Sequence, residues 1–337
     1  MSRVSSMPCR ASVAALLLLA VACRDEARLP SQPGDEILTE QTPEPEQPAA
    51  PEPAPEPTVA DVLDNRSDEP GLVFGSSGGV LNAYLNEVHT GWLNGGSISP
   101  SNVLANLSAA RAKGGRVVLK LCKGKDSYVK NSDGTFSLSK WKSLVSQYRN
   151  VNLGPYINDG TIIGHYLIDE PHRAQRWGGK GISYSTLEEM AKFSKSIWPD
   201  LNTMVRVTPS WLAGASFTWK YVDAGWTQYR STLGDPGRYI KAEAEAARRE
   251  GLGLVVGLNV LDGGNGSSKI RGYSGGKWAM SASEIRNYGS AMLAVSEACA
   301  FFNWTYDGTY YNRSDIKGAM ADVSSLARRH AKTSCRQ

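Results

Sequence analysis

The chain has 337 residues, of which 41% are hydrophobic and 21% charged, and its formal net charge is +4. This balance is ordinary for a globular protein and argues against a polyion binder such as a nucleic-acid-binding protein. All nine Trp and all fourteen Tyr lie after position 70, whereas ten of the 17 Pro lie between 24 and 70. Only the part of the chain after residue 70 therefore has the composition of a folded core.

Residues 1–23 have the pattern of a bacterial export signal. Arg3 and Arg10 precede an apolar run over 13–22 that ends at Cys23 and is too short for a stable membrane-spanning helix. Small residues before a Cys resemble the lipobox of bacterial lipoproteins, although Ala20 stands where Leu is usual. We expect lipidation at Cys23 and a lipid anchor in the bacterial cell envelope, at the outer membrane, the periplasmic face or the cell surface. Plain secretion after cleavage at a nearby Ala-x-Ala site is the alternative.

Residues 24–70 form a Pro- and Glu-rich segment with 13 acidic and 3 basic residues, a net charge of −10. Such a composition lacks the apolar surface needed to offset backbone ordering, and its alternating Pro favours an extended conformation. We predict a disordered linker that acts as a spacer, with a merely solubilising tail as the alternative. Residues 71–337 then carry a net charge of +12. The acidic segment 24–70 therefore offsets most of this charge, and the total of +4 understates how basic the predicted domain is.

Residues 71–337 alternate short apolar runs with longer amphipathic stretches. The predicted strands are 72–74, 116–121, 162–168, 203–207, 221–226, 252–258 and 299–304. The predicted helices are 100–113, 138–149, 185–196, 236–250, 281–297 and 315–331. Strands that alternate with helices favour a parallel sheet with helical crossovers.

The length of 267 residues is close to the roughly 250 of a (β/α)8 TIM barrel, so we predict one such domain over 71–337. The eighth strand is expected as a short irregular one at 151–156, which makes 162–168 strand four. Ser185 with Glu188, and Ser281 with Glu284, fit the capping box at two helix starts. A doubly wound open sheet is the alternative, but no Gly-x-Gly-x-x-Gly turn follows the first strand.

The strongest functional motif is Asp169-Glu170-Pro171, directly after the apolar strand 162–168. Barrel enzymes carry their functional groups at the C-terminal ends of the strands. Strict alternation would put Tyr166, Ile168 and Glu170 on one face and Asp169 on the other. Near the strand tip both carboxylates can still reach the barrel mouth.

This segment resembles the fourth strand of retaining (β/α)8 glycoside hydrolases, whose motif is commonly Asn-Glu-Pro with Glu as the acid/base. Asp169 replaces the Asn, and Glu170 matches the acid/base. The family expects a second Glu after strand seven, where this chain has Asn259 and then Asp262. The resemblance implies Glu170 as the general acid, with Asp262, Asp169 and Asp307, in that order, as candidates for the second carboxylate.

Aromatic and polar residues near other strand ends are suited to sugar binding, because aromatic faces cover pyranose rings and amides bind hydroxyl groups. Arg206 in the fifth strand needs a charge partner, so it pairs with Asp169 or Glu170 or binds an acidic sugar. The candidate substrate-binding residues are Trp304, Gln228, Trp226, Trp177, Arg206, Asn259, Tyr166 and Lys120.

Three further patterns point to other chemistries more weakly. The run 75–79 matches the Gly-x-Ser-x-Gly nucleophile elbow but follows the first strand, the wrong place for that fold. A buried Lys120 would suit Schiff-base chemistry, although an ion pair with the central carboxylates is the stronger expectation. His165, Asp169, Glu170 and His172 are close in sequence but lack zinc-type spacing. We therefore predict no metal and no cofactor.

Cys122, Cys299 and Cys335 remain after removal of the signal and lipidation of Cys23. Three thiols allow one internal disulfide, and Cys299 with Cys335 is the easier pair, but sequence leaves the connectivity open.

Two functional classes follow from these observations. The first is a glycosidase that cleaves O-glycosidic bonds of an extracellular or envelope polysaccharide or oligosaccharide. The second is a non-catalytic glycan-binding surface lipoprotein that keeps the barrel but lacks the strand-seven Glu. Nothing in the sequence indicates an oligomer, a nucleic acid or a protein partner, so we expect a monomer whose membrane contact is the lipid on Cys23.

Overall fold

The computed structural model describes residues 71–77, 90–94, 98–331 and 335, all within one compact unit, Pro55–Gln337. The predicted signal, 1–23, and the predicted linker, 24–70, lie outside the described residues. Within the described chain, no helix has both the length and the apolar character needed to cross a membrane.

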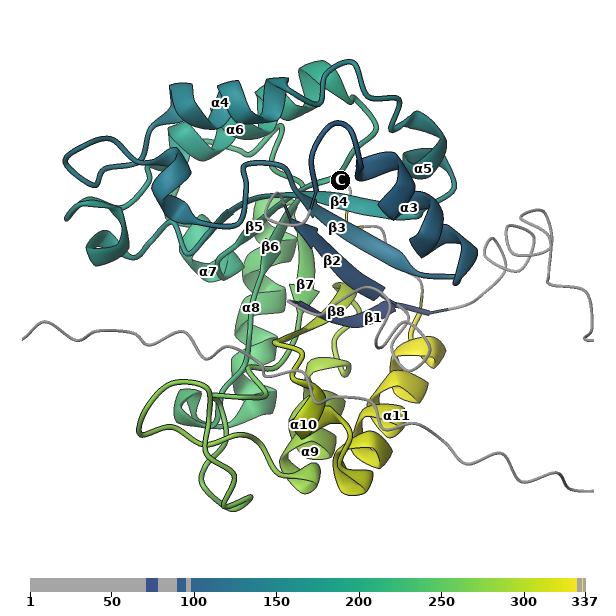
Figure 1. The fold of residues 1–337 in the computed structure, drawn as a ribbon. Coiled ribbons are helices and arrows are strands. Elements are labelled where there is room, and N and C mark those ends of the chain that lie inside the picture. The colour runs from purple at the N-terminus through teal and green to yellow at the C-terminus, as the bar shows by residue number, and fades with distance from the viewer. Residues whose placement is uncertain (1–70, 78–89, 95–97, 332–334, 336–337) are drawn as a thin grey trace, which may run out of the picture. The chain divides into compact units, whose positions relative to one another are not determined.

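Eight parallel strands form a closed barrel in chain order, which confirms the predicted (β/α)8 fold. Figure 1 shows the strands in the middle, with α4 and α6 on one side and α9 and α11 on the other. The strands are β1 (Val73–Ser77), β2 (Thr90–Asn94), β3 (Arg116–Lys120), β4 (Ile162–Asp169), β5 (Thr203–Arg206), β6 (Ala224–Trp226), β7 (Gly253–Val256) and β8 (Ala298–Trp304).

The strand missing from the sequence-based count is β2, and the prediction of a strand at 151–156 was wrong. Residues Gly154–Asn158 form the short helix α5, which Pro155 starts at its first turn. β2 pairs with β1 and runs in register with β3 from Thr90 opposite Arg116 to Asn94 opposite Lys120. Lys120 therefore ends strand three rather than strand two, while β4 remains the fourth strand.

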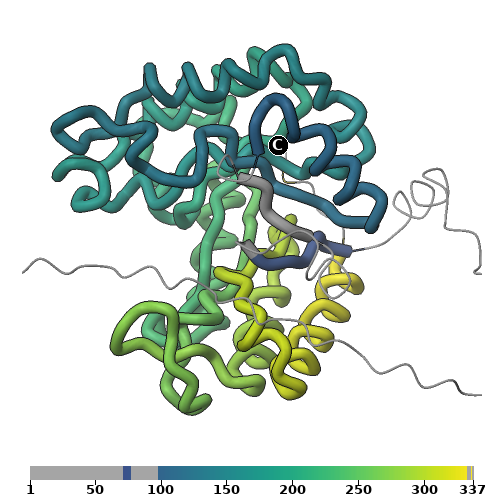
Figure 2. The backbone as a smooth tube through the Cα atoms, in the orientation of Figure 1, coloured from purple at the N-terminus to yellow at the C-terminus, as the bar shows by residue number. Residues whose placement is uncertain are grey.

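The six predicted helices are all present with small shifts at their ends. They are α3 (Val103–Ala112), α4 (Leu138–Ser146), α6 (Tyr184–Ile197), α8 (Pro236–Glu250), α9 (Ala282–Met292) and α11 (Ser314–Arg329). Shorter helical turns that were not predicted are η1 (Asp126–Val129), α5, η2 (Ala174–Trp177), α7 (Pro209–Leu212), η3 (Ser231–Leu233) and α10 (Gly308–Tyr311). Figure 2 shows the long segment between β7 and α9 as an extended loop at the lower left.

The two predicted capping boxes had different outcomes. Ser281 and Glu284 form the full reciprocal box at the start of α9. The cap of α6 is instead Ser183, whose hydroxyl accepts from the Thr186 N–H. Glu188 accepts from the backbone N–H groups of 220–222 and so fixes the segment before β6.

The core has an outer layer between strands and helices and an inner layer inside the barrel. Val117 and Leu119 of β3 belong to the outer layer, whereas Val118 belongs to the inner one. On β4 a register shift between Tyr166 and Ile168 breaks this alternation. Tyr166 lies in the inner layer, and both Leu167 and Ile168 lie in the outer layer.

This irregularity changes which side chains of β4 point together. A bulge adds one residue and reverses the side-chain alternation beyond it. Tyr166 and Asp169 therefore both face the inside of the barrel, where burial and then the Asp169 charge raise the pKa of Tyr166. The strict alternation predicted from sequence was wrong at this point.

The inner layer also contains the disulfide between Cys299 and Cys335. This is the pairing that the sequence favoured without deciding it. Cys122 is the free thiol among the described residues, and burial raises its pKa to about 11. It is therefore not a reactive thiolate near neutral pH.

Candidate functional site

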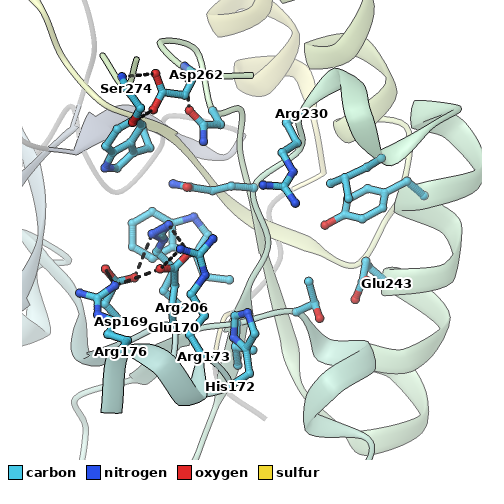
Figure 3. A pocket seen from close by; sticks show the side chains of 18 of the residues that line it. Asp169, Glu170, His172, Arg173, Arg176, Arg206, Arg230, Glu243, Asp262 and Ser274 are labelled. Carbon is cyan, nitrogen blue, oxygen red and sulfur yellow. Dashed lines mark hydrogen bonds and ion pairs between the residues drawn. The ribbon is translucent and has the colours of Figure 1, made fainter. Parts of the chain in front are cut away.

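A pocket of about 580 Å³ opens where the C-terminal ends of β4, β5, β6 and β8 meet the loops that follow β6 and β7. Its wall thus lies where barrel enzymes place their functional groups. Figure 3 shows the labelled charged side chains gathered around it. Eight predicted site residues line this pocket: Asp169, Glu170, Arg206, Trp226, Gln228, Asn259, Asp262 and Trp304.

Glu170 occupies a strained and strongly charged position on this wall. Its φ of 45° lies in the left-handed region, which non-glycine residues rarely adopt and which is frequent at functional sites. Its carboxylate is 3.1 Å from Arg173, 3.0 Å from Arg176 and 3.4 Å from Arg206. Three guanidinium groups therefore surround this carboxylate.

Asp169 is held in the same network, deeper in the barrel. Its two oxygens lie 2.7 Å from Arg176 and 2.9 Å from Arg206. Burial by itself would raise the pKa of Asp169, but the positive charges of Arg206, then Arg176 and Lys120, outweigh it and hold the pKa below its usual value. This confirms the charge partner expected for Arg206 and makes Asp169 a structural anion.

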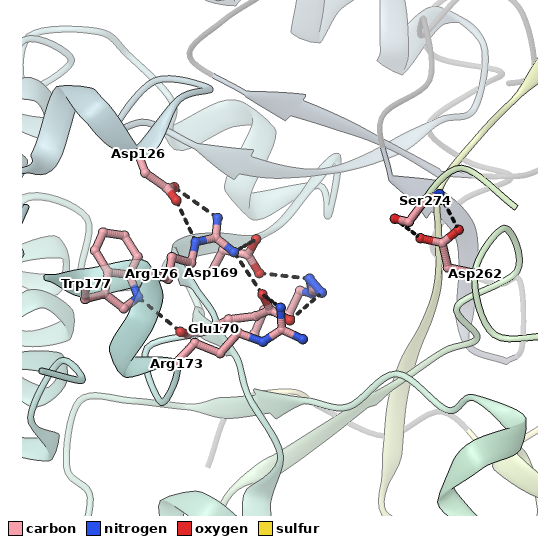
Figure 4. Close-up of polar contacts among 9 residues, drawn as sticks. Asp126, Asp169, Glu170, Arg173, Arg176, Trp177, Asp262 and Ser274 are labelled. Atoms are coloured by element: carbon pink, nitrogen blue, oxygen red, sulfur yellow. Dashed lines mark hydrogen bonds and ion pairs between the residues drawn. The ribbon is translucent and has the colours of Figure 1, made fainter. Parts of the chain in front are cut away.

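Arg176 is the hub of the network, and the sequence analysis did not select it. It pairs through Nε with Asp126 of η1 at 2.5 Å and through Nη1 with both Asp169 and Glu170. Figure 4 shows these contacts converging on one guanidinium. The only sequence signal was its place in the loop after the Asp-Glu-Pro motif, because Asp126 is 50 positions away.

Asp262 lies on the other side of the pocket, in the loop after β7. Its carboxylate accepts from the Ser274 N–H at 2.8 Å and from the Ser274 hydroxyl at 2.5 Å. Among the described residues it makes no ion pair. Figures 3 and 4 show the Asp262–Ser274 pair apart from the arginine network. Two carboxylates in contrasting surroundings therefore line one pocket.

Four predicted site residues do not line the pocket, which corrects their assignment. Asp307 is exposed and caps α10 by accepting from the Tyr310 N–H at 2.8 Å. Trp177 is fully buried, and its Nε1 donates to the Glu170 carbonyl at 3.1 Å. Tyr166 is buried beneath the pocket, with the Lys120 ammonium 5.5 Å from its ring centre. These last three support the pocket floor rather than a ligand.

The wall formed after β6 contains neutral side chains whose buried polar atoms lack hydrogen-bond partners among the described residues. Trp226 is only 3% exposed, and its buried Nε1 has no hydrogen-bond partner among the described residues. The same holds for both amide atoms of Gln228. Trp304 lines the pocket with the exposed ring of Tyr273 edge-on to it, 5.7 Å between ring centres.

Several lining residues were missed because single polar side chains outside an apolar strand carry little sequence signal. Glu243 of α8 is bonded by the Ser210 N–H and hydroxyl, and burial raises its pKa. His172 is exposed, and its pKa is lowered chiefly by partial desolvation. The others not selected are Arg173, Arg176, Val207, Thr208, Arg230, Leu233, Tyr239, Ser274 and Lys277.

The weaker chemistries also meet specific obstacles. In the run 75–79 the nucleophile position of the Gly-x-Ser-x-Gly pattern is Ser77, whose side chain lies outside the described part of the chain, while the neighbouring Ser76 is buried against the Tyr311 hydroxyl. Lys120 is buried but does not line the pocket. Among the described residues, no three His, Cys, Asp or Glu side chains are grouped as a metal site requires.

Comparisons with known proteins identify the fold. No protein-family model and no curated protein sequence matches the chain. A GH113 beta-mannanase from Alicyclobacillus acidocaldarius is similar in structure, with 12% identity, a TM-score of 0.51, and coverage of 78% of this chain and 100% of the other. A beta-glucanase from Saccharophagus degradans has 10% identity, a TM-score of 0.50 and coverage of 77% and 88%. Both likenesses concern the barrel fold, as the resemblance to barrel glycoside hydrolases implied.

Proposed function

We propose that the protein is a glycoside hydrolase that cleaves O-glycosidic bonds of an extracellular or envelope polysaccharide or oligosaccharide. The observation that carries the proposal is one pocket at the barrel mouth with Glu170 after β4 and Asp262 after β7, and with Trp304 beside them. Hydrolysis needs two carboxyl groups on opposite sides of the scissile bond. The two solved structures with the same barrel bear the names of a mannanase and a glucanase.

The surroundings of the two carboxylates suggest different roles. Glu170 makes ion pairs with three arginines, an arrangement that suits a nucleophile or a general base more than a proton donor. Asp262 has hydrogen bonds from Ser274 but no ion pair among the described residues. We therefore assign the acid to Asp262 and the ionised carboxylate to Glu170, the reverse of the family pattern.

Leaving-group chemistry tests both the activity and the roles. We expect Glu170→Gln to lose nearly all hydrolysis of every substrate. Asp262→Asn should lose hydrolysis of natural glycans but retain much of it on aryl glycosides, whose leaving groups need no protonation. The matched control is Asp307→Asn, an exposed helix cap outside the pocket. Full activity of Glu170→Gln, with its folding checked by circular dichroism, would reject the assignment.

A non-catalytic glycan-binding protein is the second candidate. It is favoured by the same contacts, because the charges of Glu170 and Asp169 are already compensated by arginines. Reducing-end release from a panel of polysaccharides, compared with binding to the same panel, separates the two candidates. Binding without turnover by the wild-type protein supports the second.

We further propose that the mature protein is anchored to the bacterial envelope by a lipid on Cys23, with the acidic segment 24–70 as a spacer. Two acyl chains suffice for firm anchoring, since each buried methylene contributes about 0.8 kcal/mol. Mass spectrometry of the mature N-terminus tests this. An unmodified terminus beyond Cys23 would support secretion instead.

A further inference from the structure

The basic side chains of the pocket fall into two groups. Arg173, Arg176 and Arg206 are neutralised by carboxylates at 2.5–3.4 Å. Arg230 and Lys277 also line the pocket, and neither side chain makes a hydrogen bond or ion pair with any described residue. Figure 3 shows Arg230 extending into the pocket on the side away from the Asp169–Glu170 pair. The pocket thus contains two basic side chains without an ion-pair partner among the described residues.

The uncharged polar groups near Arg230 also lack partners among the described residues, which likewise favours a bound ligand. The Trp226 indole is buried with an unpaired N–H donor, and the Gln228 amide lacks partners for both donor and acceptor. Buried polar groups without partners are costly and rare, and a bound ligand is one way to satisfy them. With Arg230, these residues present an excess of donors over acceptors.

The other acidic groups of the pocket form no ion pair with Arg230 or Lys277. Glu243 is hydrogen-bonded by Ser210, and Asp262 is hydrogen-bonded by Ser274. The His172 pKa is lowered, so this residue adds no charge near neutral pH. A ligand that places negative oxygens at Arg230 and Lys277 therefore displaces no existing ion pair among the described residues.

We infer that the pocket binds an anionic saccharide, one that carries carboxylate or sulfate groups, through Arg230 and Lys277. This inference rests on the proposed function for its saccharide component. The guanidinium of Arg230 suits bidentate contact with either anion. Trp226 and Gln228 bond the neighbouring ring oxygens or hydroxyl groups, and Trp304 with Tyr273 offers aromatic surface. The sequence analysis gave Arg206 as a possible ligand of an acidic sugar. We assign this binding to Arg230 instead, because Arg206 is ion-paired with Asp169 and Glu170.

Calorimetric titration of the purified wild-type protein tests the inference with three probes: oligogalacturonate for carboxylates, a sulfated dextran oligosaccharide for sulfates, and cellohexaose as a neutral glycan. We expect one anionic probe to bind at least about tenfold more tightly than the neutral one, and the better of the two identifies the anion. The preference should shrink as NaCl rises, because salt screens charge. Equal or tighter binding of the neutral probe overturns the inference without any variant.

Variants then locate the contact. Arg230→Met keeps most of the side-chain stem and should weaken anionic binding roughly 10- to 100-fold while sparing the neutral probe. Lys277→Met should act in the same direction by less, because Lys277 is exposed. Arg286→Met, at an exposed ion pair on α9, is the matched control. Unchanged anionic affinity in folded Arg230→Met and Lys277→Met overturns the assignment.

The outcomes separate this inference from the proposed function. Selective anionic binding without reducing-end release leaves the inference standing and rejects the hydrolase. Hydrolysis of neutral glycans without a preference for anionic ones supports the hydrolase and rejects the anionic-saccharide inference.

Discussion

The two walls of the pocket differ in how their polar side chains are paired. On the β4–β5 wall every charged group has a partner, and Arg176 and Arg206 each contact both Asp169 and Glu170. On the wall that follows β6, Trp226 and Gln228 keep polar atoms without partners among the described residues. The carboxylates of the first wall are therefore ion-paired, although Arg206 Nε has no hydrogen-bond partner there, whereas the second wall holds neutral polar groups that a ligand could bond.

The two walls therefore affect the protein in different ways, one through the stability of the fold and the other through ligand binding. A compensated network holds its charges in place and ties them to the stability of the fold. Unsatisfied polar groups add nothing to stability and become useful when a ligand pairs with them. Substitutions on the first wall should therefore change stability, and substitutions on the second should change binding.

Removing the central anion should have the largest effect on stability. Asp169→Asn leaves Arg206 and Arg176 short of a buried partner and should lower the free energy of unfolding by about 3–5 kcal/mol, measured by urea denaturation. Asp262→Asn, in the loop after β7, should cost about 1 kcal/mol, since the amide oxygen still accepts from Ser274. Equal losses in the two variants would contradict the contrast between the ion-paired β4–β5 wall and the rest of the pocket.

The pH dependence of stability should also trace to β4. Burial lowers the pKa of His165 to about 3. The unfolded chain takes up a proton near pH 6.5 and the folded chain does not. This stabilising difference is full above pH 6.5 and is lost as pH falls toward 3, at about 1.4 kcal/mol per pH unit.

Thermal and urea unfolding of His165→Phe between pH 4 and 7 tests this source. The variant keeps a ring against Trp141 and should lose most of the slope. His172→Gln, at the pocket, should remove a smaller part. The lowered pKa of Asp169 adds stability above about pH 4, and this stability is lost as pH falls through the pKa of Asp169 in the folded protein. Asp169 therefore affects stability at a lower pH than most of the range in which His165 does. An unchanged slope in His165→Phe would place the titrating group elsewhere.

The smallest stability effect should come from Gln228→Ala. The Gln228 amide has no described partner, so its removal should change the free energy of unfolding by only about 0.5 kcal/mol or less. Glycan affinity should fall in the same variant, as titration calorimetry can measure. A stability loss above about 2 kcal/mol would show that this wall is not held open for a ligand.

Local sequence signals predicted most of the barrel but not its irregular parts. Seven strands stood out as apolar runs, whereas β2 reads Thr-Gly-Trp-Leu-Asn and offers only two adjacent apolar residues. The strand is formed by pairing with β1 and β3, which no local pattern reveals. The bulge in β4 was equally hidden because it depends on the register with β5.

The candidate site was predicted where an apolar strand pointed to it and missed where distant residues meet. The Asp169–Glu170 pair was found because it ends a buried strand. The sequence suggested Trp177 and Asp307 as site residues, but one lies in the core and the other caps a helix. Composition cannot distinguish an aromatic residue on a pocket wall from one beneath it.

The sequence by itself determined the alternation of strands and helices, the capping box of α9 and the position of the acidic motif at a strand end, because each depends on residues within a few positions of one another. Only the tertiary structure decided which charges are compensated. Arg176 meets Asp126 from 50 positions away and Arg206 meets Asp169 from 37, while Arg230 meets no carboxylate among the described residues. Electrostatic pairing depends on distance in space, and the closed barrel sets those distances.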